Sequence, residues 1–500
     1  QAITGRVRAT TPVTMLKRPQ VMENEYLRVS FNRNGTYNVL DKENGKSYEG
    51  LGFFKDTGEI GNPWEHFTPE NDETFTTLNE NAKVTLLHEG ELEVSYKVVI
   101  DWALPEGRSM DEKTRSKHLN PCKIENIITL KKGAKYVEVE TTVDNQSEDH
   151  YLQVGFPTNI NAEFVHAQGQ FDVVKRPVAK VDHSIYDEIP MTEHPMNSFV
   201  DLSDGKEGVA LLNTGLKAYE AADDDCNTMF LSLLRSFPLR ICVTSDMQDY
   251  SSIDKGSQCI GKNTYRYAFM PHKGDWEEGK VWGESEAFNL TFSAAQLAPT
   301  AHGKNPLEHS FIELTDDTLN VSAVKRSEDG EGWVIRLFNP SDNAKTAKIR
   351  LNGGKAAIKN PQSPVERQLA EFELPQYSDE NWSEVKLVSL EEKDVAPLTM
   401  DADGFVEFEI TGKKMEELEK EMAVDARKNI SAFLCLDKIA VVEGITVTND
   451  DIEAEYANIA AQYSMPVEQV KEILGKQVNE LAQQIRSRKI NEFVVSNNSK

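Results

Sequence analysis

The 500-residue sequence contains little cysteine, no long apolar run and no cluster of basic residues. Its five cysteines are odd in number and none is spaced as Cys-x-x-Cys, so the sequence predicts neither a disulfide framework nor a zinc knuckle. The formal net charge of −27 disfavours a nucleic acid or an anionic membrane as a partner, because phosphate groups require a basic surface. We expect a cytoplasmic protein of two to four domains.

Signals for membrane insertion and secretion are also lacking. No apolar segment approaches the roughly 20 residues that a membrane-spanning helix needs, and no basic stretch leads into an apolar core near Gln1. The chain opens with Gln1 rather than Met, so we expect a processed chain or a piece of a longer one.

Familiar catalytic motifs are missing as well. The sequence has no His-Glu-x-x-His, no Gly-x-Ser-x-Gly and no phosphate-binding glycine-rich loop. Its ten histidines do not form local pairs with metal-ligand spacing, and its 82 carboxylates are too many for one pair to be singled out. The residues alone therefore predict no catalytic centre and no metal site.

Alternating apolar and polar residues dominate the first four fifths of the chain. Four segments show this period of two most clearly, and turns such as Asn34-Gly35 separate the strands: Tyr26–Phe31, Leu92–Ile100, Tyr136–Val143 and Trp333–Phe338. No alternation of strand and helix indicates a parallel sheet. We predict a mainly β protein built from a large antiparallel sandwich and a smaller one.

Composition suggests where these domains meet. Pro, Gly and polar residues cluster at Ala298–Pro306, which we interpret as the boundary between the two sandwiches. Gly353–Glu380 holds three prolines and is predicted to be a long loop of the smaller one. The expected parts are a lead-in segment at 1–20, a large sandwich at 21–300, a small sandwich at 306–413 and a helical domain at 414–500.

The last part differs sharply in composition. From Met415 onward the chain holds one of its 20 prolines, two of its 29 glycines and none of its six tryptophans. Apolar residues recur there at helical spacing, first over Leu418–Phe433, and Thr448 with its following acids is typical of a helix start. A further stripe runs from Val467 to Ile485. These faces predict either a small bundle that buries its own stripes or a groove for apolar ligands.

The β part resembles a known family. Five segments, in the same order, are similar to the region that follows the catalytic domain in bacterial α-mannosidases of glycoside hydrolase family 38: Met22–Trp64, His194–Glu220, Leu231–Phe237, Gly256–Trp276 and Val321–Asp342. The resemblance implies a large "supersandwich" and a small β-sandwich that pack against a catalytic domain and close one side of a sugar pocket. It implies a retaining mechanism and a zinc ion held by two His and two Asp of that upstream domain, so no cofactor is expected in this chain.

The resemblance also suggests residues for the rim of that sugar pocket. They are Asn62 and Trp64 in the sequence GEIGNPW, His194 in HPMNSF, Arg235 in LSLLRSF and His272 in MPHKGDW. Trp stacks on sugar faces, and Arg and His donate hydrogen bonds to hydroxyls. The alternative for each is a structural role in a turn or strand. The implied partners are a mannose-containing sugar and the catalytic domain, and the chain alone is expected to be inactive.

The helical tail resembles a different family. Leu436–Val495 is similar to the C-terminal substrate-binding region of bacterial trigger factor, a ribosome-associated chaperone. That resemblance implies binding of unfolded polypeptide at the tail, whereas the ribosome-docking and prolyl isomerase domains of the family have no counterpart here. Because no Gly/Ser/Pro linker separates the two parts near 411–416, we expect a fusion of two gene pieces, natural or artefactual. If it is natural, the tail is expected to mediate self-association.

Overall fold

The structure is a computed structural model, and it describes residues 14–179, 191–242, 247–294, 310–330, 332–351, 384–411, 442–463, 465–474, 481–482, 485–486, 488–490, 493 and 496. It divides into two compact units, 1–413 and 414–500. The predicted domain boundary at 298–306, the predicted loop at 353–380 and the predicted helix at 418–433 lie outside the described residues.

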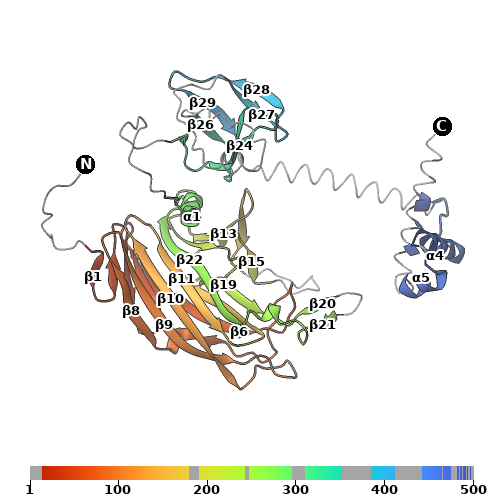
Figure 1. Cartoon of the computed structure of the whole chain (residues 1–500), viewed down its shortest axis with the longest axis horizontal. Coiled ribbons are helices and arrows are strands. Elements are labelled where there is room, and N and C mark those ends of the chain that lie inside the picture. The colour runs from red at the N-terminus through yellow and green to blue at the C-terminus, as the bar shows by residue number, and fades with distance from the viewer. Residues whose placement is uncertain are drawn as a thin grey trace, which may run out of the picture. The chain divides into compact units, whose positions relative to one another are not determined.

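Three antiparallel sheets build the large sandwich (Figure 1). The first has five strands that follow one another along the chain: β1 (Leu16–Arg18), β2 (Val21–Glu23), β3 (Leu27–Phe31), β4 (Tyr37–Asp41) and β5 (Ser47–Leu51). The second has nine strands, in the order β14 (Val173–Pro177), β13 (Phe164–Gln168), β16 (Phe199–Ser203), β17 (Glu207–Thr214), β22 (Gly261–Lys273), β11 (Val137–Asn145), β10 (Leu119–Lys131), β9 (Glu93–Pro105) and β8 (Ala82–Glu89).

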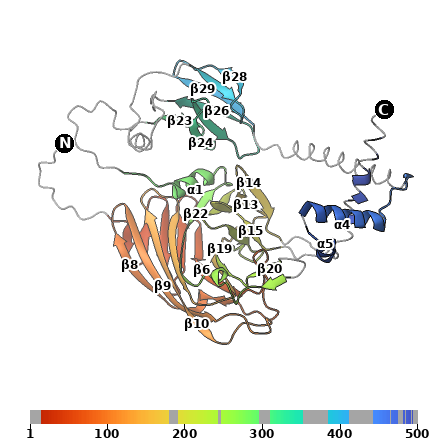
Figure 2. The same ribbon diagram turned by 45° about the vertical axis from the view of Figure 1, so that its right-hand side comes forward.

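The third sheet of the large sandwich has six strands. Their order is β15 (Glu193–Pro195), β18 (Ala218–Ala221), β19 (Met229–Ser236), β12 (His150–Phe156), β6 (Phe53–Gly58) and β7 (Phe75–Thr76). A separate hairpin is formed by β20 (Arg240–Cys242) and β21 (Met247–Asp249), and two single 3₁₀ turns lie at Thr77–Asn79 and Gly256–Gln258. Figure 2 shows β8, β9 and β10 side by side in one array.

One continuous apolar core joins the three sheets. It contains Val29 and Tyr48 of the first sheet, Val98 of the second and Val154 and Leu231 of the third, all fully buried. Because successive strand residues point to opposite faces, the neighbours Gln153 and Ser232 lie on the other face of the six-stranded sheet. We call this the outer face of that sheet.

The nine-stranded sheet has a second, smaller cluster on its own outer side. There the helix α1 (Val281–Asn289) packs on β16 and β17 and buries Phe199, Ala210 and Met270 (Figure 1). The small sandwich contains three sheets. They are β23 (Ile312–Leu314), β26 (Lys345–Leu351) and β29 (Phe405–Ile410); β24 (Asn320–Arg326) and β25 (Trp333–Phe338); and β27 (Val385–Val388) and β28 (Asp394–Leu398).

The second unit is helical. Its described helices are α4 (Asn449–Tyr463) and α5 (Val467–Leu474), which bury Tyr456, Ala460 and Val470 against one another and against Ile485. Every strand pairing in the described parts of the first unit is antiparallel. The predicted fold class, mainly β with sandwiches and a small helical region, is therefore confirmed.

Within the described ranges, no helix is long and apolar enough to span a bilayer.

Candidate functional site: a braced loop that exposes a tryptophan

The loop at residues 59–67 follows β6 and carries two of the predicted sugar-contact residues. Its backbone closes on itself, because the amide of Ile60 donates to the carbonyl of Phe67 at 2.8 Å and the amide of Asn62 donates to the carbonyl of Glu65 at 3.0 Å. The Asn62 Oδ1 accepts hydrogen bonds from the amides of Trp64 (2.9 Å) and Glu65 (3.0 Å). Asn62 is therefore a buried turn-forming residue whose side chain is occupied.

A glycine makes this turn possible. A Cβ added at Gly61 would lie 2.0 Å from the carbonyl oxygen of Glu65 and 2.8 Å from Oε1 of Glu59. Both distances are shorter than van der Waals contact, so a larger residue at this position would force the two sides of the loop apart.

Beneath the loop lies Glu59, whose carboxylate is fully buried. Its Oε1 accepts hydrogen bonds from the amides of Gly61 (2.6 Å) and Phe67 (3.3 Å). Its Oε2 lies 2.6 Å from Nδ1 of His66 and 3.6 Å from Nη1 of Arg235. A buried carboxylate is stable only when such partners compensate its lost hydration, and here all of them belong to the loop or to the strand beneath it.

Two arginines hold the carbonyl groups of the loop. Arg235 projects from the outer face of β19, and its Nη2 donates to the carbonyl of Asn62 at 2.8 Å and to that of Pro63 at 2.9 Å. Arg240, at the start of β20, donates through Nη1 to the carbonyl of Ile60 at 2.7 Å. Hydrogen bonds from a charged donor are stronger than neutral ones, so these contacts fix the loop to β19 of the sheet and to β20 of the separate hairpin.

Polar residues continue across the outer face beside the loop. Gln153 donates to Oε2 of Glu220 at 2.9 Å, and Nζ of Lys55 lies 3.2 Å from the same oxygen. The ring of His66 lies 4.7 Å from that of Tyr151, whose hydroxyl bonds to Ser232. Burial raises the pKa of Tyr151 well above its ordinary value. The polar groups of these residues therefore act as hydrogen-bond and ion-pair partners for one another.

Trp64 is the exception in this well-packed region. Its side chain is 65% exposed, whereas Asn62, two positions earlier, is 6% exposed. Phe67, at the other end of the loop, is also exposed. The aromatic surface of Trp64 is therefore accessible to a ligand. Among the five predicted residues, Trp64 is the one whose side chain is exposed.

His194 lies on β15, but on the side of the strand that faces away from the loop. Its ring is 6.0 Å from that of the buried Tyr219, and its pKa is lowered by burial and by the charge of Arg176. The preceding residue, Glu193, points to the outer face, where Oε1 lies 4.0 Å from Nε2 of His66. The residue of this strand that reaches the loop network is thus Glu193.

His272 belongs to the nine-stranded sheet. Its Nε2 lies 2.6 Å from Oδ2 of Asp201, and its Nδ1 lies 3.1 Å from the carbonyl oxygen of Lys273. Burial opposes the charged imidazole, but the Asp201 carboxylate outweighs it and raises the pKa of His272. Neither partner belongs to the 59–67 loop, so the structure does not bring His272 together with Asn62, Trp64 and Arg235.

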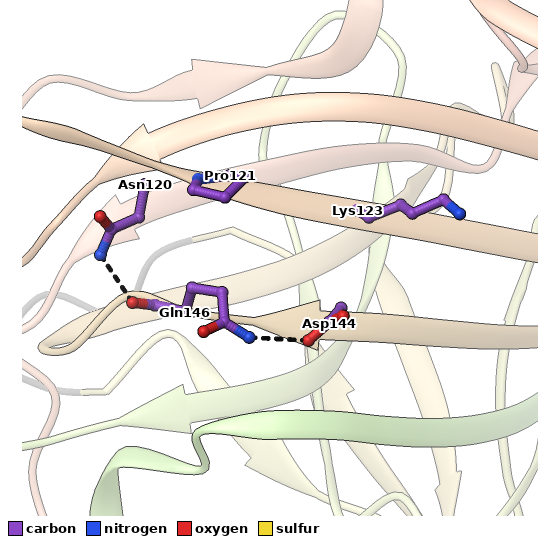
Figure 3. Close-up of a pocket in the computed structure, with 5 residues that line it drawn as sticks. All are labelled: Asn120, Pro121, Lys123, Asp144 and Gln146. Carbon is purple, nitrogen blue, oxygen red and sulfur yellow. Dashed lines mark hydrogen bonds between the residues drawn. The ribbon is translucent and has the colours of Figure 1, made fainter.

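A separate groove lies over β10 and β11 of the nine-stranded sheet (Figure 3). It has a volume of about 340 Å³ and is lined by Asn120, Pro121, Lys123, Asp144 and Gln146. Asn120 donates to the carbonyl of Gln146 at 2.7 Å, and Gln146 donates to Asp144 at 2.8 Å. Lys123 pairs with Glu125 outside the groove at 2.7 Å, and none of the predicted residues lines it.

The resemblance implies a zinc ion in the upstream domain, and the described residues of this chain offer no comparable set of ligands. Within the ranges that the structure describes, no three His, Cys, Asp or Glu side chains are grouped so that they could hold a metal ion. His272 has a single carboxylate partner, and His66 lies between Glu59 and Glu193 with its Nε2 4.0 Å from the second, which is far from a metal-ligand geometry. The zinc site of the upstream domain remains a prediction.

Sequence reasoning missed the four residues that brace the loop, Glu59, His66, Glu193 and Arg240. A signal existed for two of them, because Glu59 and His66 flank the predicted turn directly in the sequence EIGNPWEH. Glu193 and Arg240 come from strands more than 120 positions away, and only the folded structure shows that both lie beside the loop.

Comparison with known families covers most of the chain. Residues 22–238 match the glycosyl hydrolases family 38 C-terminal domain, and residues 318–416 match the C-terminal beta sandwich domain of the same family. Residues 400–496 match the C-terminus of the bacterial trigger factor protein, so the last two matches overlap by a short segment around β29.

Individual relatives fall into the same two groups. A putative mannosylglycerate hydrolase of Halalkalibacterium halodurans is 26% identical over 336 residues, which cover 64% of this chain and 36% of that protein. Alpha-mannosidase G of Dictyostelium discoideum is 24% identical over 340 residues, 65% of this chain and 28% of its own length. A trigger factor of Carboxydothermus hydrogenoformans is 38% identical over 223 residues, 45% of this chain and 47% of that protein.

Solved structures agree with the first group. The crystal structure of an alpha-mannosidase from Enterococcus faecalis V583 superposes with a TM-score of 0.63 at 26% identity, and the match covers 69% of this chain and 40% of that one. The chain spans about a third of the length of the mannosidase-like relatives it matches. Residues 22–238 and 318–416 thus belong to the C-terminal domains of glycosyl hydrolase family 38, and residues 400–496 belong to the C-terminal domain of bacterial trigger factor.

Proposed function

We propose that the β domains form the non-catalytic rear of an α-mannosidase, in which the 59–67 loop supplies one wall of the sugar site. The observation that carries the proposal is the exposed indole of Trp64 on a loop fixed by Arg235, Arg240 and the buried Glu59. The similarity to a mannosylglycerate hydrolase and to α-mannosidases supports a mannose-containing sugar as the substrate.

The physical basis is stacking on a preorganised surface. The apolar face of a pyranose ring packs on an indole, and the buried area stabilises the complex at roughly 25 cal/mol per Å². Binding is further favoured when the backbone that carries the aromatic side chain does not have to be ordered first. The hydrogen bonds that close the 59–67 loop supply that order before any sugar arrives.

Bond cleavage is assigned to a catalytic domain outside these β domains. Retaining glycosidases use two carboxylates about 5 Å apart, one as nucleophile and one as acid and base. The buried Glu59 cannot serve as either, because both of its oxygens are engaged by the loop amides, His66 and Arg235. The zinc ion of the family, bound in the catalytic domain, would orient sugar hydroxyls there.

Sugar binding by the chain tests the role of Trp64. We expect saturation-transfer NMR to detect methyl α-D-mannopyranoside bound to the purified chain, and the signal to be lost in Trp64→Ala. Trp333→Ala is the matched control, because Trp333 is also a partly exposed tryptophan but lies on β25 of the small sandwich. Equal signals in the wild type and Trp64→Ala would contradict the proposal.

A second candidate function concerns the helical unit. The match to the trigger factor C-terminus and the exposed apolar side chain of Val442 favour binding of unfolded polypeptide there. We expect the full chain to suppress aggregation of a reduced, unfolding protein such as insulin, and a chain ending at residue 413 to do so less. Equal suppression by both chains, each shown to be folded by circular dichroism, would remove this candidate.

A further inference from the structure

We propose that Arg235 is a positioning residue, which sets the direction in which the 59–67 loop presents Trp64 and does not itself contact the sugar. This inference rests on the proposed sugar-stacking role of Trp64. The sequence suggested that Arg235 donates hydrogen bonds to sugar hydroxyls. We instead assign it to holding the loop that carries Trp64.

The geometry begins with two consecutive carbonyl groups. A single nitrogen, Nη2 of Arg235, donates to the carbonyl oxygens of Asn62 (2.8 Å) and Pro63 (2.9 Å). Because the guanidinium is planar and rigid, both oxygens are held in a fixed relation to the strand that carries Arg235. The next residue along the chain is Trp64.

The backbone between these carbonyls and the indole has little freedom. The ring of Pro63 fixes its φ angle, and the amide of Trp64 is bonded to Oδ1 of Asn62 at 2.9 Å. With the carbonyl of Pro63 held by Arg235, both ends of the peptide unit that leads into Trp64 are bonded. The guanidinium therefore fixes the position of the Trp64 Cα, and the bond from the Glu65 amide to Oδ1 of Asn62 (3.0 Å) limits rotation of the backbone that sets the direction of its Cα–Cβ bond.

Charge and stacking fix the guanidinium in turn. Nη1 lies 3.6 Å from the buried Glu59 carboxylate, and the guanidinium carbon lies 4.8 Å from the centre of the Phe237 ring. Both hydrogens of Nη2 are directed at loop carbonyls, since a terminal guanidinium nitrogen carries two. Nη2, the nitrogen that faces the loop, therefore has no hydrogen left to donate to a sugar. For this reason we assign Arg235 to supporting the loop and not to binding the sugar.

Arg266 offers a matched control with the same set of contacts elsewhere. It donates through Nη1 to the carbonyl of Phe288 at 3.1 Å, lies 3.2 Å from a carboxylate oxygen of Glu138 and stacks on the ring of Phe288 at 4.1 Å. It lies on β22 of the nine-stranded sheet. Its loss removes an equivalent set of interactions without touching the loop.

The first test observes Trp64 directly and needs no sugar. The chain is labelled with 5-fluorotryptophan, its Trp64 resonance is assigned with Trp64→Phe, and ¹⁹F spectra are compared for Arg235→Ala, Arg235→Lys and Arg266→Ala. We expect the Trp64 line to narrow and move toward the free amino acid in Arg235→Ala, to move part of the way in Arg235→Lys, and to stay in place in Arg266→Ala. An unchanged Trp64 line in both Arg235 variants would overturn the inference.

The second test measures affinity for methyl α-D-mannopyranoside. Arg235→Ala should weaken binding by about three- to tenfold, the factor expected when one side chain must be ordered on binding, with a smaller loss in Arg235→Lys. If Arg235→Ala does not fold, the fluorine line of Arg235→Lys decides. A wild-type chain that binds no sugar would refute the proposed function, whereas the fluorine spectra would still decide whether Arg235 positions Trp64.

Discussion

Single residues decide whether the 59–67 loop can present an aromatic ring. Asn62 closes the turn with its side chain, and Gly61 leaves room for the chain to return. The carboxylate of Glu59 accepts hydrogen bonds from backbone amides of the loop. None of these residues offers a free group to a ligand. Their shared effect is to leave Trp64 outside the packed region while its backbone is held within it.

Gly61 provides a prediction at this scale. Gly61→Ala should lower the free energy of unfolding by about 1–3 kcal/mol, because its Cβ overlaps a carbonyl oxygen that cannot move without breaking the turn. Chemical denaturation measures the change. Gly283→Ala is the control, since a Cβ there meets no atom within 4 Å and Ala is favoured in the helix α1. Equal stability of the wild type and Gly61→Ala would contradict the geometry of the loop.

The strands and helices show which structural features the sequence could predict. The predicted strands Leu92–Ile100 and Tyr136–Val143 correspond to β9 and β11. They could be predicted because one face of each strand is buried and the other is more exposed to solvent, which produces an alternating pattern. Trp333–Phe338 coincides with β25. The glycine of Asn34-Gly35 has the positive φ, +88°, that such a turn needs.

Other elements lacked a readable pattern. All seven residues of β12 (His150–Phe156) are buried, since the outer face of that strand is covered too, so no alternation marks it. Its neighbour β6 lies about a hundred residues earlier, and such a pairing depends on the whole sheet rather than on local sequence. For the same reason the sequence could suggest Trp64 and Arg235 separately but not that one supports the other.

The helix α4 allows a prediction about its own start. The Thr448 amide donates to Oδ2 of Asp451 at 2.7 Å, and the Asp451 amide donates back to Oγ1 of Thr448 at 3.3 Å. Thr448→Ala removes this cap and should destabilise the helical unit by about 1 kcal/mol. Thermal unfolding followed by circular dichroism measures it, with the exposed Thr446→Ala as control. The cap would be unimportant if both variants melted alike.

At the scale of the whole molecule, two families are joined in one chain. Matches to the family 38 C-terminal domains cover residues 22–238 and 318–416, and the match to the trigger factor C-terminus begins at residue 400, just before the last strand of the small sandwich. Each unit has its own apolar core. We therefore propose that the β domains supply one wall of a sugar site and that the helical unit binds polypeptide. Neither unit is proposed to cleave the glycosidic bond.

The measurement that tests this central claim most directly is hydrolysis of a chromogenic α-mannoside by the purified 500-residue chain, with and without added zinc. An active family 38 α-mannosidase assayed in parallel shows that the conditions support turnover. We expect no product above background in either condition, because the proposed function places the catalytic carboxylates and the metal in a separate domain. Turnover that depends on the concentration of this chain would contradict it and would place an active site within the β domains.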